Sequence, residues 1–110
     1  MQYELEIRLM NALEAEPRQS QRRLSEACDV SLGTIHYCLN ALIEKGFVKA
    51  QNFRNSGNKL AYAYILTHSG INHKRKITIA FLKRKKREFD TLKKEIALLE
   101  NDLKQQERRE

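Results

Sequence analysis

Several residue types and patterns are scarce in this chain, and each scarcity excludes a class of protein. It holds one proline, four glycines, two cysteines and no tryptophan among 110 residues. No apolar run reaches the ~18 residues of a membrane-spanning helix, and the first residues carry acids where a secretory signal peptide carries lysines. Two cysteines do not make the disulfide framework of a small secreted domain. We therefore expect a cytoplasmic protein without membrane contact, built as one domain with an appended arm.

The residue patterns of active sites and metal sites are missing as well. The histidines His36, His68 and His73 fall in different predicted elements. Cys28 and Cys38 do not have a zinc-ligand spacing with His36. No catalytic triad motif and no glycine-rich phosphate loop occurs, so we expect no enzyme, no metal and no cofactor. Both cysteines fall on inward helix positions, where small buried thiols are common, and an oxidation switch between them is the alternative.

Positive charge is concentrated in one part of the sequence. Residues 71–87 contain eight Lys or Arg and no Asp or Glu. Residues 1–70 contain eight against seven, and residues 88–110 contain five against seven, so the net charge of +7 comes from the middle block. A basic patch of this kind is typical of proteins that bind polyanions. The alternative is a solvated helix face without a partner.

The stretch from Ser20 to Gly46 predicts two short helices joined by a tight turn. Ser20 and Ser31 are suited to cap the starts of the two helices. Gly46 is placed to end the second helix with a left-handed residue. Leu24 and Ala27 supply the inward side of the first helix.

The second of these helices has one apolar and one polar side. Apolar residues recur at the three- and four-residue steps that line one side of a helix: Ile35, Cys38, Leu39, Leu42 and Ile43. The other side carries Gly33, Thr34, His36, Tyr37 and Asn40. A helix anchored by its apolar side and exposing such groups has the form of a helix that enters the DNA major groove.

The polar residues can be assigned to DNA contacts by their chemistry. Candidate base-contacting residues are Thr34, His36, Tyr37 and Asn40, and Gly33 would allow close approach of the backbone. Asn40 could form a two-point bond with adenine. Candidate phosphate-contacting residues are Arg22, Arg23 and Ser31, which lie near predicted helix starts. Alternatively, Tyr37 packs against the hairpin described next and His36 is only solvated.

The segments on either side complete a small domain. Residues 2–16 predict a first helix, which Pro17 stops. Residues 47–53 and 60–66 predict two strands of a hairpin, because turn-forming residues separate them. Arg54 and Lys59 flank the hairpin tip, where they could reach a minor groove or phosphates; an ordinary polar turn is the alternative.

Residues 69–106 predict one long helix, because they contain no proline and no glycine after Gly70. Thr67 is suited to cap its start. The first half carries a broad apolar arc suited to packing on a globular domain: Ile71, Ile77, Ile79, Phe81 and Leu82. The second half repeats apolar residues at coiled-coil spacing, interrupted at Lys85: Leu82, Phe89, Leu92, Ile96, Leu99 and Leu103. We call these six residues the seam, and expect two copies of the chain to form a homodimer through them. The charges flanking the seam do not decide whether the two helices are parallel.

Together these patterns predict a mainly helical fold with a small β-hairpin: a winged helix-turn-helix in residues 1–68, followed by a long coiled-coil dimerisation helix in residues 69–110. The residues VSLGTIHYCLNALIEKGFVKA, the hairpin and LTHSG resemble MarR-type bacterial transcriptional regulators. From residue 3 to about residue 100 the chain is similar to a short subgroup associated with exopolysaccharide gene clusters.

The resemblance implies a homodimer that places two recognition helices in successive major grooves of double-stranded DNA. It places Thr34, His36, Tyr37 and Asn40 on the recognition helix, with Arg54 and Lys59 in the wing. Typical members are longer and often hold a small phenolic ligand, so the resemblance leaves an effector undefined here. Two alternatives stay open: a protein-interaction adaptor that uses the winged helix and the coiled coil, and a non-specific nucleic-acid binder that uses residues 74–87.

Overall fold

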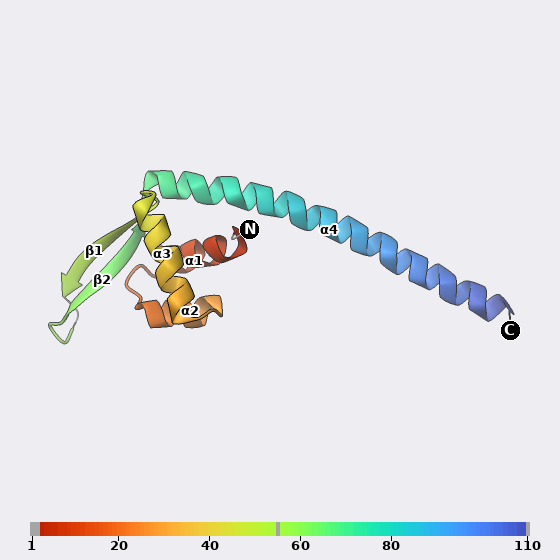
Figure 1. Cartoon of the computed structure of the whole chain (residues 1–110), viewed down its shortest axis with the longest axis horizontal. Coiled ribbons are helices and arrows are strands. Elements are labelled where there is room, and N and C mark those ends of the chain that lie inside the picture. The colour runs from red at the N-terminus through yellow and green to blue at the C-terminus, as the bar shows by residue number, and fades with distance from the viewer. Residues whose placement is uncertain (1–2, 55, 110) are drawn as a thin grey trace. The chain divides into compact units, whose positions relative to one another are not determined.

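The computed structural model describes residues 3–54 and 56–109. Within these ranges the elements follow the order α1 (Tyr3–Ala15), α2 (Gln21–Cys28), α3 (Leu32–Glu44), β1 (Val48–Arg54), β2 (Leu60–Leu66) and α4 (His68–Arg109) (Figure 1). The chain divides into two compact units, Met1–Thr78 and Ile79–Glu110, so the start of α4 belongs to unit 1. The predicted mainly helical fold with one hairpin and a long last helix is confirmed. Gln2, included in the predicted first helix, lies outside the described residues.

Helix α1 supplies much of the core of unit 1. Leu9, Met10 and Leu13 are buried, and they fall on one side of the helix because their spacing follows its turn. The helix ends at Ala15, before Glu16 and Pro17, as the proline predicts. It contacts α2 and strand β2, while α2 contacts α3. The residues of α1 therefore hold the other elements around one apolar centre.

Side-chain caps fix where α2 and α3 begin. The backbone N–H of Arg23 donates to Oγ of Ser20, and that of Thr34 donates to Oγ of Ser31, both at 3.1 Å. The two predicted N-caps are therefore confirmed. The predicted inward side of α2 is correct for Leu24, which is buried, but wrong for Ala27, which is exposed. Cys28, four residues after Leu24 on the same side of α2, is buried, which confirms its predicted inward position.

The end of α3 is a two-bond cap formed around Gly46. Gly46 has φ of 77°, its N–H donates to the carbonyl of Ile43 at 3.0 Å, and the N–H of Phe47 donates to the carbonyl of Leu42 at 2.9 Å. This pairing uses two carbonyls that a helix end otherwise leaves without partners. The left-handed residue predicted at Gly46 is confirmed, and it directs the chain into β1.

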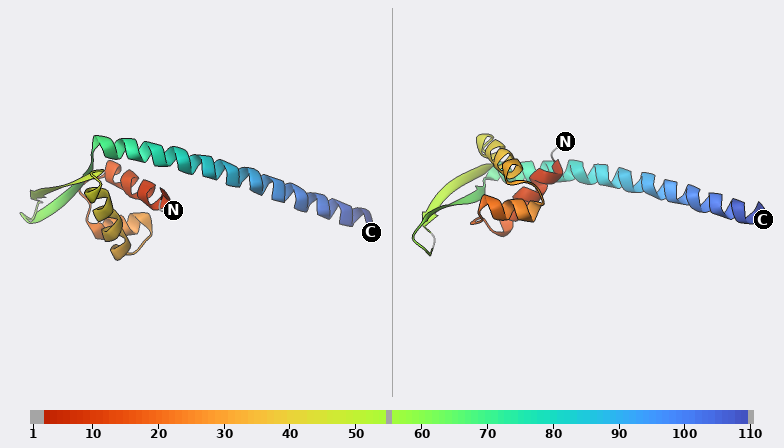
Figure 2. Two further views of the ribbon diagram at one scale, coloured as in Figure 1. Left: turned by 45° about the horizontal axis from the view of Figure 1, so that its top comes forward. Right: turned by 60° about the horizontal axis from the view of Figure 1, so that its bottom comes forward.

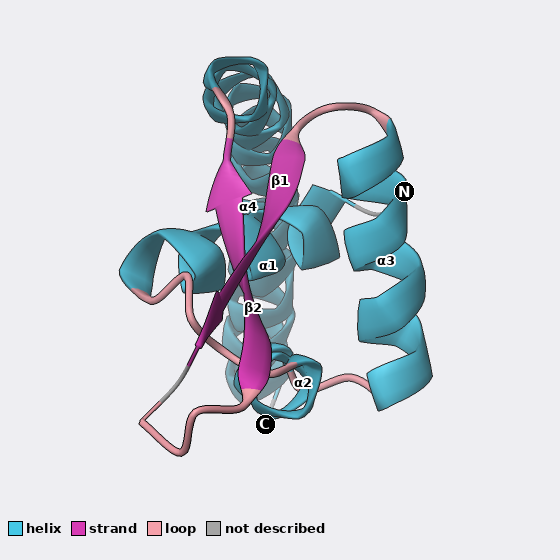
Figure 3. Cartoon of the chain, turned by 90° about the vertical axis from the view of Figure 1, so that its left-hand side faces the viewer, coloured by secondary structure: helices cyan, strands magenta, loops and turns pink. Residues whose placement is uncertain are grey.

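Strands β1 and β2 form an antiparallel hairpin in which Val48 pairs with Leu66 and Arg54 pairs with Leu60. Figure 3 shows the hairpin as a twisted ribbon, and Figure 2 shows its outer end extending away from α1, α2 and α3. Its base is buried at Val48 and Tyr64, whereas Leu60 and Tyr62 are exposed. The bulky side of β2 is therefore buried toward the base of the hairpin and exposed toward its tip.

The first turns of α4 lie against the connection between α3 and β1. Gly70 N–H donates to Oγ1 of Thr67 at 3.1 Å, which confirms the predicted cap at Thr67. Oγ1 of Thr67 also donates to the carbonyl of Gly46 at 2.6 Å. Ile77 is buried, but Ile71, Ile79 and Leu82 are exposed, so the predicted broad apolar arc is wrong for these three residues. One narrow face of this helix, not a broad arc, meets the core.

Unit 2 is the remainder of α4, from Ile79 onward. Apart from the half-buried Phe81, its apolar side chains are exposed in the single chain. They include all six seam residues, each between 46% and 63% accessible. Arg84 and Lys85 pair with Glu88 along the helix, and that pairing lowers the pKa of the Glu88 carboxyl. No helix in residues 3–54 and 56–109 is long and apolar enough to cross a membrane.

Candidate nucleic-acid interface

Helix α3 presents one rigidly held face to solvent. Ile35, Leu39 and Leu42 are at most 1% accessible on its inward side. The polar residues predicted for its other side are all exposed: Gly33, Thr34, His36, Tyr37 and Asn40. Since the buried residues fix the rotation of the helix, the direction of each exposed side chain is fixed as well.

Glu44 belongs to the same exposed face, although the sequence analysis did not single it out. It follows Gly33, Tyr37 and Asn40 at steps of three or four residues, so the four positions form one row along α3. Its helical spacing was the available signal. A carboxylate in this row would repel phosphates but can accept a hydrogen bond from the amino group of cytosine.

One edge of the face is joined to α2 and β2 by hydrogen bonds. Nδ2 of Asn40 lies 3.0 Å from Nε2 of His36, and Nδ1 of His36 lies 3.1 Å from Oε1 of Gln21. Nε2 of Gln21 donates to the hydroxyl of Tyr64 at 3.4 Å. His36 is therefore not simply solvated. Gln21 and Tyr64 gave no sequence signal, because their partners lie 15 and 43 residues away.

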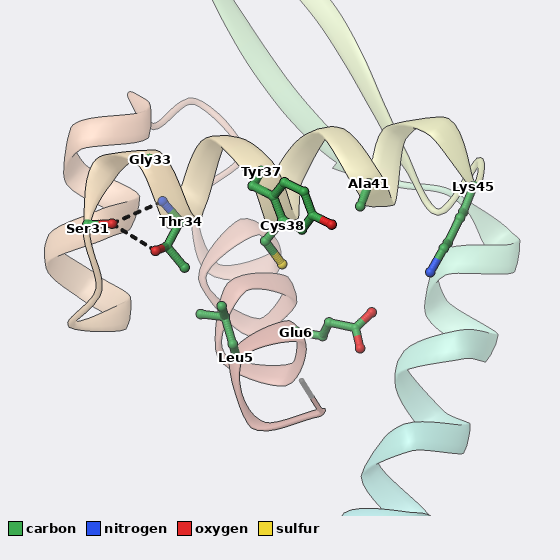
Figure 4. Close-up of a pocket in the computed structure, with 9 residues that line it drawn as sticks. All are labelled: Leu5, Glu6, Ser31, Gly33, Thr34, Tyr37, Cys38, Ala41 and Lys45. Carbon is green, nitrogen blue, oxygen red and sulfur yellow. Dashed lines mark hydrogen bonds between the residues drawn. The ribbon is translucent and has the colours of Figure 1, made fainter. Parts of the chain in front are cut away.

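The opposite edge of the face borders a hollow of about 580 Å³ between α1 and α3 (Figure 4). Leu5 extends from α1 toward α3, whereas Glu6 points toward α4, where its Oε1 lies 3.2 Å from Nε2 of His73. Thr34 and Tyr37 lie on the α3 side. Tyr37 is 79% accessible, so it does not pack against the hairpin. The predicted base-contacting residues thus have two kinds of neighbour: His36 and Asn40 are hydrogen-bonded toward α2, whereas Thr34 and Tyr37 border the hollow beside α1.

The predicted phosphate contacts lie at the starts of the two short helices. Arg22 and Arg23 are exposed in the first turn of α2, which contains no acidic residue. Two cations at a helix N-terminus are unfavourable beside the positive end of the helix dipole, and a bound anion would reverse that effect. Oγ of Ser31 already caps α3 and lies 2.8 Å from Oγ1 of Thr34, so this hydroxyl is held in place.

The predicted basic residues of the hairpin tip are both exposed. Nη1 of Arg54 donates to the carbonyl of Asn58 at 3.3 Å, and this bond links the end of β1 to the turn. Asn58 has φ of 56°, a conformation that asparagine tolerates better than most residues. Lys59 is exposed and follows directly in the turn. Arg18 lies over the ring of Phe53 at 4.7 Å, which adds a third cation near the outer half of β1.

The two cysteines are buried free thiols. Burial raises the pKa of Cys28, and it raises the pKa of Cys38 from 9.0 to about 11. Both groups therefore stay protonated near neutral pH, and a protonated thiol is a poor nucleophile. Among the described residues no group of three or more His, Cys, Asp or Glu is arranged to hold a metal ion.

Comparison with known proteins assigns this arrangement to a fold. Residues 4–49 match a protein-family model described as winged helix-turn-helix DNA-binding. Unit 1 has the winged helix-turn-helix fold. In that fold α2 and α3 are the helix-turn-helix, and the hairpin is the wing. No curated protein matches the sequence.

Two solved structures share the fold at low sequence identity. The PcaV transcriptional regulator from Streptomyces coelicolor is 22% identical with a TM-score of 0.57, and the match covers 72% of this chain and 57% of that one. A MarR family transcriptional regulator from Silicibacter pomeroyi DSS is 17% identical with a TM-score of 0.59, and the match covers 90% of this chain and 68% of that one. The chain thus spans little more than half of the length of PcaV.

Proposed function

We propose that this chain is a sequence-specific double-stranded DNA-binding transcriptional regulator of MarR type, and that it acts in the cytoplasm as a homodimer. The observation that carries the proposal is the exposed polar face of α3. It lies within the residues that match the winged helix-turn-helix DNA-binding model, and a buried apolar side holds it in place. An α-helix that exposes amide, imidazole and hydroxyl groups in this way fits the major groove.

Phosphate contacts would come from three places around this face. Arg22 and Arg23 would bind one strand beside α3, and Arg54 and Lys59 would contact the backbone or minor groove beyond the wing. Residues 74–87 would add long-range attraction, because their charges are uniformly positive. The same basic block favours a second candidate, a non-specific nucleic-acid binder, in which α3 reads no bases.

Dimerisation through α4 follows from the exposed seam. Six apolar side chains at coiled-coil spacing, interrupted once at Lys85, form a stripe on unit 2. Such a stripe is stable in water only when another helix covers it, and a second copy supplies an identical stripe. We propose residues 1–68 as the DNA-binding domain and residues 69–110 as the dimerisation helix. The resemblance to the short MarR-type subgroup extends the proposal to control of exopolysaccharide genes.

A competition binding experiment tests the proposal against the non-specific alternative. The labelled duplex would be the DNA upstream of the chain's own gene, titrated by fluorescence anisotropy with and without excess random-sequence DNA. We expect binding that survives the competitor and a log–log salt slope near −5, which corresponds to ~6 neutralised phosphates. Complete loss of binding in competitor DNA would favour the non-specific binder. A protein-interaction adaptor would bind neither duplex.

The variant Arg22→Ala/Arg23→Ala tests the proposed phosphate contacts of α2. Removing two cations should weaken binding to specific and random duplexes by similar factors and reduce the salt slope by about 2. The same titration at four salt concentrations measures both quantities. Lys104→Ala/Arg108→Ala, on the C-terminal part of α4, is the matched control for the loss of two positive charges. A similar slope for wild type and the α2 variant would refute the assignment.

A further inference from the structure

A continuous series of hydrogen bonds runs from the proposed recognition helix to the wing. It joins Asn40 to His36 at 3.0 Å, His36 to Gln21 at 3.1 Å and Gln21 to Tyr64 at 3.4 Å. These residues come from α3, α2 and β2. Tyr64 is 8% accessible, and its backbone N–H donates to the carbonyl of Pro17 at 2.9 Å. The series therefore begins at an exposed amide and ends at an anchored strand.

The chemistry of the atoms gives the series a direction. Nδ2 of Asn40 can only donate, so Nε2 of His36 must accept. The ring proton then resides on Nδ1, which donates to Oε1 of Gln21, an atom that can only accept. The neutral Nδ1–H tautomer of His36 satisfies both contacts. The orientation of the Gln21 amide thus determines the tautomer of His36, and the tautomer determines which end of the Asn40 amide faces the ring.

This arrangement leaves a defined edge of Asn40 available to a base. One N–H is used by His36, and in the described part of the chain Asn40 makes no other side-chain hydrogen bond. Its Oδ1 and second N–H remain available to a base. An acceptor beside a donor matches the N6 amino group and N7 of adenine. Turning the amide over would exchange the acceptor and the donor along this edge and break the bond to His36.

We propose, on the basis that α3 reads DNA, that Gln21 and His36 are positioning residues that orient the Asn40 amide and so select adenine at one operator position. Neither residue needs to touch the base. Both contacts of His36 lie at the surface and that of Gln21 with Tyr64 is only partly buried, and a single hydrogen bond of this kind adds little to folding stability. Removing Gln21 or His36 should therefore change base preference much more than it changes stability.

Selection of binding sites from a randomised duplex pool tests the inference. Wild type should prefer adenine at one position by roughly tenfold or more, and Asn40→Ala should abolish that preference. His36→Ala and Gln21→Leu should each reduce it at least about threefold while leaving the other positions unchanged. Gln21→Glu keeps an acceptor for Nδ1–H and should retain the preference. Gln105→Leu, an exposed position on α4, is the matched control for Gln21→Leu.

The tautomer of His36 provides a readout that does not depend on DNA. Side-chain nitrogen NMR of the free protein should show His36 with its proton on Nδ1 in wild type and Gln21→Glu. In Gln21→Leu the Nε2–H form should appear, with an unchanged thermal unfolding midpoint. A wild-type ring protonated mainly on Nε2 would overturn the inference even if every variant bound DNA.

The outcomes separate this inference from the proposed function. If wild type selects no sequence, the proposed function fails. If wild type selects a sequence and Asn40→Ala relaxes one position, but His36→Ala and Gln21→Leu leave that position unchanged, only the positioning role fails. If Asn40→Ala weakens all sequences equally, the base-reading role of Asn40 fails and the positioning role fails with it.

Discussion

Replacing Gly70 by alanine should destabilise unit 1, because this glycine lies where α4 passes over the connection between α3 and β1. Gly70 is buried, and a Cβ built on it would lie 2.9 Å from the carbonyl carbon of Phe47 and closer still to the carbonyl oxygen. Both atoms belong to the backbone, so no side-chain rotation can relieve the overlap. Either the start of α4 or the end of the α3–β1 connection must move.

The size of the effect follows from the contacts that such a movement would strain. The N–H of Thr67 donates to the carbonyl of Phe47 at 3.1 Å, and the hydroxyls of Thr67 and Ser69 donate to the carbonyl of Gly46 at 2.6 and 3.1 Å. Overpacking costs about 1–3 kcal/mol, and each lost hydrogen bond costs about 1 kcal/mol. Alanine recovers at most about 1 kcal/mol of helix propensity. We expect a net loss of about 2–3 kcal/mol.

Urea unfolding of the full chain, followed by circular dichroism at one fixed protein concentration, measures this loss. The matched control is Gly33→Ala, because the nearest atom to a Cβ at Gly33 is Oγ of Ser31 at 4.0 Å. This control should raise stability by up to about 1 kcal/mol through helix propensity alone. If Gly70→Ala is as stable as Gly33→Ala, the packing of α4 on Phe47 is wrong.

Three further changes have defined outcomes. Asn40→Ala should weaken binding to the preferred duplex by ~1–3 kcal/mol and leave random-duplex binding nearly unchanged, and equal losses in the two titrations would refute base reading. Leu92→Glu/Leu99→Glu should give monomers by light scattering, because each carboxylate would enter the proposed seam. The outward Gln105→Glu control should stay dimeric, and a dimer that persists in the double variant would show that the seam lies elsewhere. Because burial raises the pKa of Cys38 to about 11, its alkylation at pH 8 should be roughly 100-fold slower in the folded chain than in urea. Because the unfolded thiol ionises near pH 9 and the folded thiol near pH 11, the free energy of unfolding of wild type should fall as the pH rises from 9 to 11, and Cys38→Ala should lose less stability across that window. Equal alkylation rates in the folded chain and in urea would refute the burial.

Local sequence signals predicted the elements that depend on neighbouring residues. Ser20 and Ser31 cap helices because a side-chain oxygen reaches a backbone N–H three residues away in the same segment. The end of α3 at Gly46 could be predicted because it depends only on the local backbone conformation, which glycine adopts easily. The six seam residues share one stripe for the same reason, since helical periodicity alone sets their direction.

Contacts between distant segments could not be predicted in this way. Ala27 and Ile71 have acceptable inward spacing, but the neighbouring elements do not reach them, so both are exposed. The pairing of Gln21 with His36 and the close approach of Gly70 to Phe47 join residues 15 and 23 positions apart. Periodicity predicts which side of a helix is apolar, whereas tertiary packing determines which residues on that side are buried by another element.

The sequence by itself therefore determined the elements, their caps and the polar face of α3, because these depend on spacings of a few residues. The tertiary structure decided how that face is divided. His36 and Asn40 are tied to α2 and the wing, while Thr34 and Tyr37 border the hollow beside α1. The physical reason is that a side chain's partners depend on which segments folding brings within hydrogen-bond distance, and residue spacing along one helix carries no information about that distance.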